Sequence, residues 1–330
     1  MSTPPWISSH LDADGRLRFD RFMELALYDP QHGYYTTHIT NVGRSADFST
    51  TATLSNTLGQ ALAHWIQSHR LRHVIEIGAG NGTLAHSIRR ALPFLTRLRL
   101  HFHIVERSPV LRKLQQELLG SRVTWHDTPA SALDAAHGEA LLYSNEVPDA
   151  FPARIFRATK FHDAYEELFL LPQGGSLAET WLPAPLLPDS TLFAHAWQEG
   201  QRLEVLDSYH TWLTDWIPHW KSGTMLTIDY GDTPAEIYHR RPGGSLRGYL
   251  LHQLVTSPDT YANPGRQDLT TDVNFDDLES WGSQLGLRTL SRQTQSQFLA
   301  PHARPTHTDT FLTDPKGVGG AFKVLQQKPL

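Results

Sequence analysis

The stretch EIGAGNGTLA at residues 76–85 places three glycines and one acidic residue where a ligand could be held. Gly78, Gly80 and Gly82 follow an apolar run and precede a run with helical periodicity, so we expect a turn from a strand into a helix. Glycine permits a sharp turn and lets a ligand approach the main chain, and the helix that follows offers free N–H groups to an anion. Glycine turns after strands also occur for structural reasons. The loop alone therefore indicates either a tight turn or a cradle for part of a cofactor.

Acidic residues follow three further apolar runs. Glu106 ends IVE, where its carboxylate could accept hydrogen bonds from two ribose hydroxyls, or could lie next to a helix cap. Asp127 ends VTWHD and is expected either to contact an adenine or to lie in a solvated turn. Glu146 and Asp149 follow EALLYSN and are three residues apart, so they could face one pocket from a single helical turn, with helix capping as the alternative.

The scaffold of these residues is predicted by alternating strand and helix patterns. Strands are predicted over 73–78, 100–106, 122–127, 139–146, 224–231 and 319–328, and helices over 83–92 and 108–120. This alternation predicts βαβ units and a mostly parallel, doubly wound α/β sheet. Two regions, residues of about 1–70 and about 153–220, interrupt the alternation and are too long for simple loops. We expect both to cover the ligand edge of the sheet.

Composition excludes several classes of protein. Hydrophobic residues make up 39% of the 330 residues, which is enough for a sizeable core and argues against global disorder. The net charge is −5 and no basic run occurs, which argues against nucleic acid as the main partner. The chain has no cysteine, so disulfides and cysteine-bound zinc are excluded. His101 and His103 share one face of an expected strand but lack a third ligand, so no metal site is expected.

The first residues, MSTPPWISSHLDADGRLRFD, contain neither a long apolar core nor an arginine-rich amphipathic face. The sequence also lacks an apolar run of roughly 20 residues that could span a bilayer. From these features we expect no targeting signal and no membrane span, and a cytoplasmic location.

Motifs along nearly the whole chain resemble, in the same order, those of the MidA-like methyltransferases, the family of the mitochondrial complex I assembly-factor protein arginine methyltransferase. These motifs are FMELALYDPQHGYYT (22–36), ADFSTTATLSNTLGQALAHWI (46–66), EIGAGNGTLA (76–85), IVERSPVLRKLQQ (104–116), SNEVPDAFP (144–152), IDYGD (228–232), GSLRGYLLH (244–252), PGRQDLTTDVNF (264–275) and FLTDPKGVGGAFKVL (311–325). The G-x-G-x-G spacing after Glu76 resembles motif I of the class I S-adenosylmethionine-dependent methyltransferases. The resemblance implies a Rossmann-like, mostly parallel seven-stranded sheet, S-adenosyl-L-methionine as cofactor, and a protein arginine as one type of methyl acceptor.

The resemblance and the strand ends together define the expected site and domains. The expected cofactor-binding residues are Glu76, Gly78, Ala79, Gly80, Gly82, Glu106, Arg107, Asp127 and Asn145. The expected catalytic residues are Glu146, Asp149 and His252, and the expected substrate-binding residues are Asp47, Thr50, Asp229, Tyr230 and Tyr249. His252 would act as a general base for a neutral acceptor, and the aromatic residues from Tyr28 to Tyr35 are interpreted as helix-packing core. We expect an N-terminal helical cap segment over 1–70 and a methyltransferase domain over 71–330. Insertions at about 153–220, between the fourth and fifth strands, and at about 232–275 would cap it.

The acceptor side of the chain departs from the family pattern. Thr51, Ala52 and Thr53 stand where the family has Ser-Pro-Glu, whereas the cofactor loop is intact. Val147 and Pro148 also differ from the family, although the neighbouring Asn, Glu and Asp are kept. Three hypotheses follow: a protein methyltransferase acting on arginine, a small-molecule N- or O-methyltransferase, or a non-catalytic assembly factor that binds the cofactor. A homodimer is left open.

Overall fold

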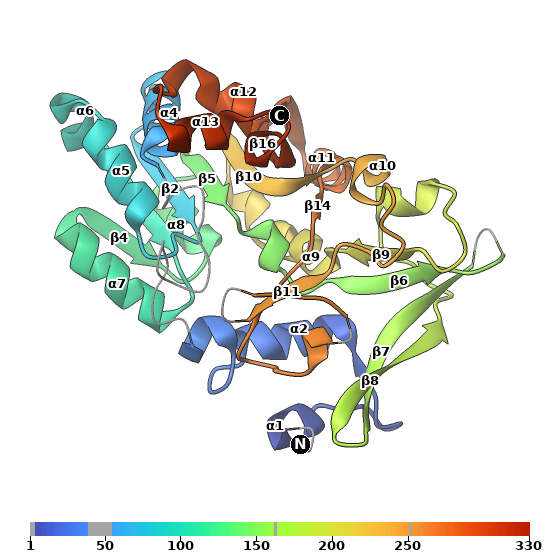
Figure 1. Ribbon diagram of the computed structural model, residues 1–330. Helices are drawn as coiled ribbons and strands as arrows, with labels where there is room; N and C mark the ends of the chain where they lie inside the picture. Colours follow the sequence, from blue (N-terminus) through green and yellow to red (C-terminus); the bar gives the residue numbers. More distant parts are fainter. Residues whose placement is uncertain (1–3, 39–54, 162–163, 251–252, 258) are drawn as a thin grey trace. The chain divides into compact units, whose positions relative to one another are not determined.

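The computed structural model describes residues 4–38, 55–161, 164–250, 253–257 and 259–330 (Figure 1). The chain divides into two compact units. The first comprises Met1–Ile39, Pro148–Thr211 and Thr233–Asp277, and the second comprises Thr40–Val147, Trp212–Asp232 and Leu278–Leu330. Each unit is built from segments that lie far apart in the sequence.

A mostly parallel sheet forms the centre of the second unit. Its strands are β2 (His73–Ile77), β3 (His101–Val105), β4 (Val123–His126), β5 (Leu141–Asn145), β10 (Met225–Asp232), β15 (Leu287–Thr294) and β16 (Phe322–Pro329). They follow the order β15-β16-β10-β5-β2-β3-β4. The pairs from β10 to β4 are parallel, whereas β16 is antiparallel to both β10 and β15. The predicted Rossmann-like α/β sheet is therefore confirmed.

Helices flank this sheet. They are α4 (Thr57–Gln67), α5 (Thr83–Ala91), α6 (Phe94–Arg99), α7 (Pro109–Leu119), η2 (Gly120–Arg122), α8 (Pro129–Ala135), η5 (Ile217–His219), α12 (Gln295–Leu299), η7 (Ala300–His302), α13 (His307–Thr313) and α14 (Val318–Ala321). The start of α7 follows from its sequence, because the Ser108 side chain caps the helix and Pro109 occupies its first turn. Strand β16 begins at Phe322, three residues later than predicted, because Val318–Ala321 form a short helix. The core contains Leu62, Ile104 and Tyr143 among its fully buried residues.

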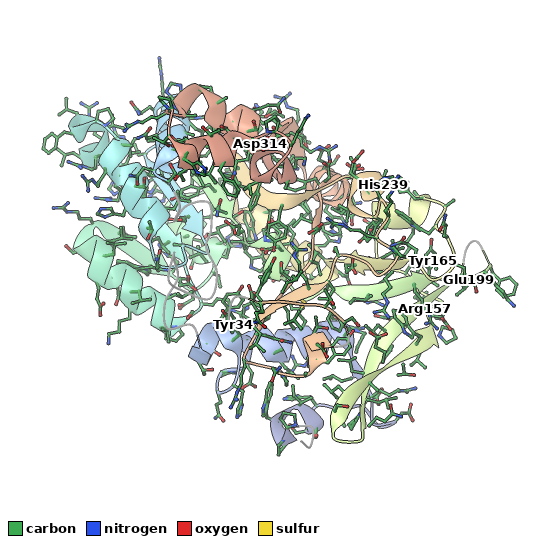
Figure 2. The ribbon with its side chains drawn as sticks, viewed as in Figure 1. Tyr34, Arg157, Tyr165, Glu199, His239 and Asp314 are labelled. Carbon is green, nitrogen blue, oxygen red and sulfur yellow. The ribbon has the colours of Figure 1, made fainter. Side chains whose placement is uncertain are left out.

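The first unit contains antiparallel sheets that the sequence patterns did not predict. Its strands are β1 (Leu17–Arg18), β6 (Arg154–Ala158), β7 (Tyr165–Gln173), β8 (Ser176–Pro183), β9 (Arg202–Val205), β11 (Arg247–Leu250), β12 (Gln253–Val255), β13 (Asp268–Thr270) and β14 (Val273–Asn274). One sheet has the order β1-β7-β6-β9, with β8 paired to β7, and another has the order β12-β11-β13. Figure 2 shows Arg157 and Tyr165 on the neighbouring strands β6 and β7.

The helices of the first unit are short apart from one. They are α1 (Pro5–Ser8), α2 (Phe19–Tyr28), η1 (Tyr34–His38), η3 (Pro148–Ala150), η4 (Thr191–Ala194), α10 (Pro234–Ile237) and η6 (Asp259–Tyr261), while α9 (Asp207–Trp216) and α11 (Phe275–Gln284) cross the boundary between the units. Helix α2 buries Phe19, Phe22, Met23, Ala26 and Leu27, which have the i, i+3, i+4, i+7, i+8 spacing of an amphipathic helix.

The described part of residues 1–70 is divided between the two units. The elements α1, β1, α2 and η1 belong to the first unit and α4 belongs to the second. The assignment of this segment, and of the two insertions, to caps over the ligand edge stays a prediction.

Candidate cofactor and active site

The glycine loop of residues 78–82 connects β2 to α5 in the predicted place. Gly78, Gly80 and Gly82 have φ angles of +67°, +53° and +83°, a left-handed region that glycine adopts without steric cost. A Cβ atom on Gly78 would lie 2.6 Å from the Val147 side chain. A Cβ atom on Gly80 would meet no atom within 4 Å. The loop therefore combines a left-handed backbone with open space beside Gly80, which fits a ligand cradle better than a filled structural turn.

The sheet topology brings the predicted acidic residues to the same edge as this loop. Strands β2, β3, β4 and β5 are parallel, so their carboxyl ends lie at one edge of the sheet. Gly78, Glu106, Asp127 and Glu146 each follow directly after one of these strands. The strand order also reverses between β2 and β5, the point at which open α/β sheets bind ligands.

The Glu106 carboxylate is buried and held from two sides. Its Oε1 accepts a hydrogen bond of 2.9 Å from the Ser108 amide, and its Oε2 accepts one of 3.0 Å from the Gln115 side chain. Burial raises the pKa of this carboxyl, and the hydrogen bonds from Ser108 and Gln115 oppose that shift. Helix α7 is capped by Ser108, whose Oγ accepts from the Leu111 amide, so Glu106 is not the capping side chain. A carboxylate has about four acceptor positions, which leaves capacity for two ribose hydroxyls.

Gln115 is a site residue that the sequence analysis missed. Its side chain has no exposed surface. The Nε2 atom donates to the Gly80 carbonyl at 2.8 Å as well as to Glu106, and Oε1 accepts from the Trp125 indole at 2.9 Å. Gln115 thus ties the glycine loop to the predicted ribose-binding acid. The sequence did contain one indication of its role. Gln115 lies between Leu111 and Leu119 at i, i+4, i+8 spacing, so it is a polar residue on the buried face of α7.

Glu76 lies inside β2 and is 2% exposed. Its Oε2 accepts a 2.9 Å hydrogen bond from the hydroxyl of Tyr143, its register partner on β5. Burial raises the pKa of Glu76 to about 8, so the side chain carries a proton at neutral pH. The buried pair supports the strand from which the glycine loop departs, and direct contact of Glu76 with the cofactor stays a prediction.

Asp127 and Arg107 are exposed members of the predicted cofactor set, as is Gly78. The Asp127 side chain is 86% exposed and pairs with Arg112 at 2.7 Å. Arg112 also donates to the main-chain carbonyls of Glu106 and His126, at 2.7 and 3.1 Å, and so joins the ends of β3 and β4. Ala79 is buried within the loop, where its carbonyl accepts from the Gly82 amide at 2.8 Å. Cofactor contacts by Asp127, Arg107 and Ala79 stay predictions.

The end of β5 carries two features typical of a functional site. Glu146 has φ +56°, although it is not glycine, and left-handed backbone costs an L-residue about 1–2 kcal/mol. Its Oε1 accepts a hydrogen bond of 2.9 Å from the side-chain amide of Asn145. The Asn145 Oδ1 atom is buried and has no hydrogen-bond partner within the described part of the chain. Backbone strain of this kind concentrates at functional sites. The Oδ1 atom of Asn145 could accept a hydrogen bond from a bound ligand that carries an N–H or O–H donor. These residues therefore fit the predicted cofactor.

Asp149 begins a separate local arrangement in the first unit. It lies in η3, which starts at Pro148, so Glu146 precedes this turn and the expectation of one shared helical turn is wrong. Asp149 is 8% exposed and its Oδ2 accepts from the Thr270 hydroxyl at 2.8 Å.

Near it, buried Asp268 accepts a 2.8 Å hydrogen bond from the Tyr35 hydroxyl. Burial and the charge of Asp149 raise the pKa of Asp268 to about 7. Tyr35 also stacks on Tyr28 with ring centroids 5.5 Å apart, so this aromatic segment has a polar contact as well as its packing role.

The predicted substrate-binding residues and His252 lie in several different parts of the chain. Asp229 and Tyr230 lie inside β10, opposite Lys323 and Phe322 of β16, and the strand continues to Asp232. Asp229 is fully buried and accepts from the Tyr230 amide at 2.8 Å. Tyr249 lies on β11, opposite Asp268 in the register. Substrate contacts by Asp229, Tyr230 and Tyr249 stay predictions, and Asp47, Thr50 and His252 lie outside the described residues.

His73, His103 and His126 of the second unit form a hydrogen-bonded row. His103 is 5% exposed and bonds to His73 at 3.0 Å and to His126 at 2.9 Å, whereas His101 is exposed and stacks on His73. Across the described ranges, no group of three or more histidine, aspartate or glutamate side chains is arranged to hold a metal ion.

Comparison with known proteins defines the class of this enzyme. A family model described as an S-adenosyl-L-methionine-dependent methyltransferase matches residues 57–293. The chain therefore belongs to the MidA-like family of S-adenosyl-L-methionine-dependent methyltransferases. It is a methyltransferase, and S-adenosyl-L-methionine is its cofactor.

Individual relatives cover most of the chain. Protein arginine methyltransferase NDUFAF7, mitochondrial, of Xenopus tropicalis is 25% identical, over 88% of this chain and 72% of its own length. The Drosophila melanogaster homolog is 23% identical, over 96% of this chain and 82% of its own length. A crystal structure from Burkholderia thailandensis with bound S-adenosyl-homocysteine has a TM-score of 0.82 and 27% identity, covering 96% of this chain and 88% of that one.

These relatives also correct the predicted location. The proteins from Xenopus tropicalis, Danio rerio and Drosophila melanogaster are described as mitochondrial. The names of these relatives contradict the expected cytoplasmic location. No helix among the residues that the structure describes is both long and apolar enough to cross a membrane.

Proposed function

We propose that this methyltransferase transfers the methyl group to a guanidinium nitrogen of an arginine side chain in a protein. The Glu146 carboxylate carries this proposal. It lies directly after β5, at the carboxyl edge that also holds the glycine loop, and the Asn145 amide fixes one of its oxygens. The names of the relatives, which describe protein arginine methyltransferases, support the same acceptor class.

Each group of the site has a distinct task in this proposal. The bound cofactor supplies an electrophilic methyl group on a sulfonium centre. The glycine loop and Glu106 hold it, through open space beside Gly80 and a carboxylate fixed by Ser108 and Gln115. Glu146 accepts hydrogen bonds from the guanidinium, fixes its plane and draws positive charge away from the attacking nitrogen. Alignment of this nitrogen with the methyl group provides most of the rate enhancement.

We propose that residues other than Glu146 also bind the methyl acceptor. The catalytic role predicted for Asp149, whose carboxyl group is buried, is part of this proposal. A guanidinium remains charged at neutral pH, so a site for it requires ionised carboxylates that a neutral acceptor would not need. We also propose that the acceptor is a protein and that the enzyme is a homodimer.

Mass spectrometry of acceptor proteins incubated with methyl-labelled cofactor tests this function. Glu146→Gln should keep cofactor affinity nearly unchanged and reduce methyl transfer by orders of magnitude, because the lost charge acts on the acceptor. Glu117→Gln, an exposed glutamate on α7, is the matched control and should remain active. If Glu146→Gln is active and His252→Ala is inactive, a small-molecule N- or O-methyltransferase with a general base replaces the arginine proposal.

A further inference from the structure

A basic cleft lies in the second unit beside the helices that follow β2. Its volume is about 100 Å³, and its polar lining consists of His86, Arg89, Arg90, Arg97 and Arg122, which we call the arginine cleft. His86, Arg89 and Arg90 lie on α5, Arg97 lies on α6, and Arg122 ends η2. Figure 1 shows α6 extending outward from the end of α5.

The arginines of this cleft are not neutralised by the protein. No carboxylate of the described residues lies within ion-pair distance of any of the four guanidinium groups. Arg89 is held in place by a 3.2 Å hydrogen bond to the Arg122 carbonyl and by the Phe102 ring, whose centroid is 5.2 Å from the guanidinium carbon. Burial and the charges of Arg122 and Arg97 lower the pKa of Arg89. The cleft therefore concentrates positive charge that repels itself, in a protein whose net charge is −5.

Such a cleft is suited to a phosphate group. The guanidinium fork forms two parallel hydrogen bonds to phosphate oxygens, and an anion between the arginines would convert their mutual repulsion into attraction. A small soluble anion would explain the positive charge of the cleft, but it would not explain the exposed apolar side chains beside it.

Large apolar side chains lie next to the arginine cleft and are exposed. Phe94, Leu95 and Leu98 on α6 are 62%, 66% and 66% exposed, and Leu118 on α7 is 43% exposed; we call these four residues the apolar rim. Helix α6 has no buried residue, so its apolar side chains contribute nothing to the core. A face that combines protruding apolar side chains with arginines matches a surface with anionic headgroups above hydrocarbon. A nucleic acid would match the arginines without using three exposed side chains of α6.

We infer that the arginine cleft and the apolar rim together form a face that docks reversibly on an anionic phospholipid membrane. A lipid phosphate occupies the cleft, and Phe94, Leu95 and Leu98 enter the boundary between headgroups and acyl chains. The docking is peripheral, since it uses one short helix and its neighbours. This inference goes beyond methyl transfer and does not depend on which acceptor is used.

Co-sedimentation of the full chain with lipid vesicles tests this inference. Vesicles of phosphatidylcholine alone are compared with vesicles that also contain phosphatidylglycerol, and we expect binding only to the second kind. Binding should weaken as salt is raised, because the attraction between exposed charges is screened. Inorganic phosphate at matched ionic strength and an RNA oligonucleotide are added as separate competitors.

Two double variants separate the contribution of the arginine cleft to vesicle binding from that of the apolar rim. Arg90→Glu combined with Arg97→Glu should weaken vesicle binding roughly tenfold or more, since each basic residue near the surface contributes to the attraction. Phe94→Ser combined with Leu98→Ser should weaken it comparably and should fold, because both side chains are mostly exposed. Arg288→Glu and Leu186→Ser are the matched controls, an exposed arginine and an exposed leucine elsewhere, and should bind as the natural protein does.

The outcomes separate this inference from the proposed function. All variants should bind S-adenosyl-homocysteine with unchanged affinity in calorimetry, since none belongs to the glycine loop. Equal binding to both kinds of vesicle, or binding to neither, would overturn docking on an anionic membrane, as would full binding by the Phe94/Leu98 variant. Complete competition by inorganic phosphate would indicate a small-anion site instead, and competition by RNA would indicate a nucleic-acid surface.

Discussion

The side-chain amide of Gln115 donates a 3.0 Å hydrogen bond to the carboxylate of Glu106. Gln115 is fully buried and bonds to the Gly80 carbonyl through the same nitrogen. The two elements predicted to hold the cofactor, the loop after β2 and the acid after β3, are therefore joined by one side chain of α7.

Replacement of Gln115 by leucine should weaken binding of S-adenosyl-homocysteine. A hydrogen bond to a charged group contributes about 1.5–3 kcal/mol, so we expect the Kd to rise about tenfold or more. Calorimetric titration measures this change. Gln116→Leu, at an exposed position of the same helix, is the control and should bind normally.

Because Gln115 acts through Glu106, the two substitutions should not be additive. Glu106→Gln alone should raise the Kd at least about tenfold, and adding Gln115→Leu should cost less than it does in the natural protein. Fully additive losses would show that Gln115 supports the loop independently of Glu106.

The pair of Glu76 and Tyr143 predicts a pH dependence of stability. Burial raises the pKa of Glu76 from 4.5 to about 8, so the folded chain retains a proton that the unfolded chain has lost between these values. The free energy of unfolding should therefore fall as the pH rises through this window, with a slope of at most about 1.4 kcal/mol per pH unit. Glu76→Gln should remove this contribution and flatten the profile in that window. Chemical unfolding across this pH range is the measurement, and parallel profiles of the two proteins would contradict a raised pKa.

Local patterns in the sequence predicted the parts of the site that lie next to strand ends. Gly80, Glu106 and Glu146 could be predicted as site residues because an apolar run, a turn and a helix signal occur in neighbouring residues. Gln115 was missed because its partners, Trp125 and Glu106, approach it only in the folded structure.

The differences between the predicted and the observed fold also come from contacts between residues that are distant in the sequence. The antiparallel pairing of β10 with β16, which comes from the end of the chain, is contained in no local pattern. The antiparallel sheet of the first unit joins β1 to β7, more than a hundred residues later, and no local pattern contains that pairing. The parallel strands from β2 to β5 were predictable because each crossover between them is a short segment that contains a helix, whereas the crossover from β5 to β10 spans residues 146–224.

The left-handed backbone of Glu146 predicts opposite effects on stability and activity. Glu146→Gly should relieve the strain and raise the free energy of unfolding by about 1 kcal/mol, while methyl transfer is lost with the carboxylate. His137→Gly is a matched control, because exposed His137 has the same φ of +56°. It should be stabilised to a similar degree and remain active. If Glu146→Gly retained full methyl transfer, the strain at this residue would have no catalytic purpose.

Cofactor binding by the loop of residues 78–82 is tested by calorimetric titration of S-adenosyl-homocysteine into Gly80→Ala and Gly174→Ala. The two glycines have φ angles of +53° and +58°, and a Cβ atom on either would meet no atom within 4 Å. Both substitutions therefore impose the same backbone strain, and only the first places a methyl group in the expected ligand space. We predict that Gly80→Ala raises the Kd at least about tenfold, or roughly 1.4 kcal/mol, while Gly174→Ala leaves it unchanged. Unchanged affinity in both variants would contradict the assignment of the cofactor site to this loop.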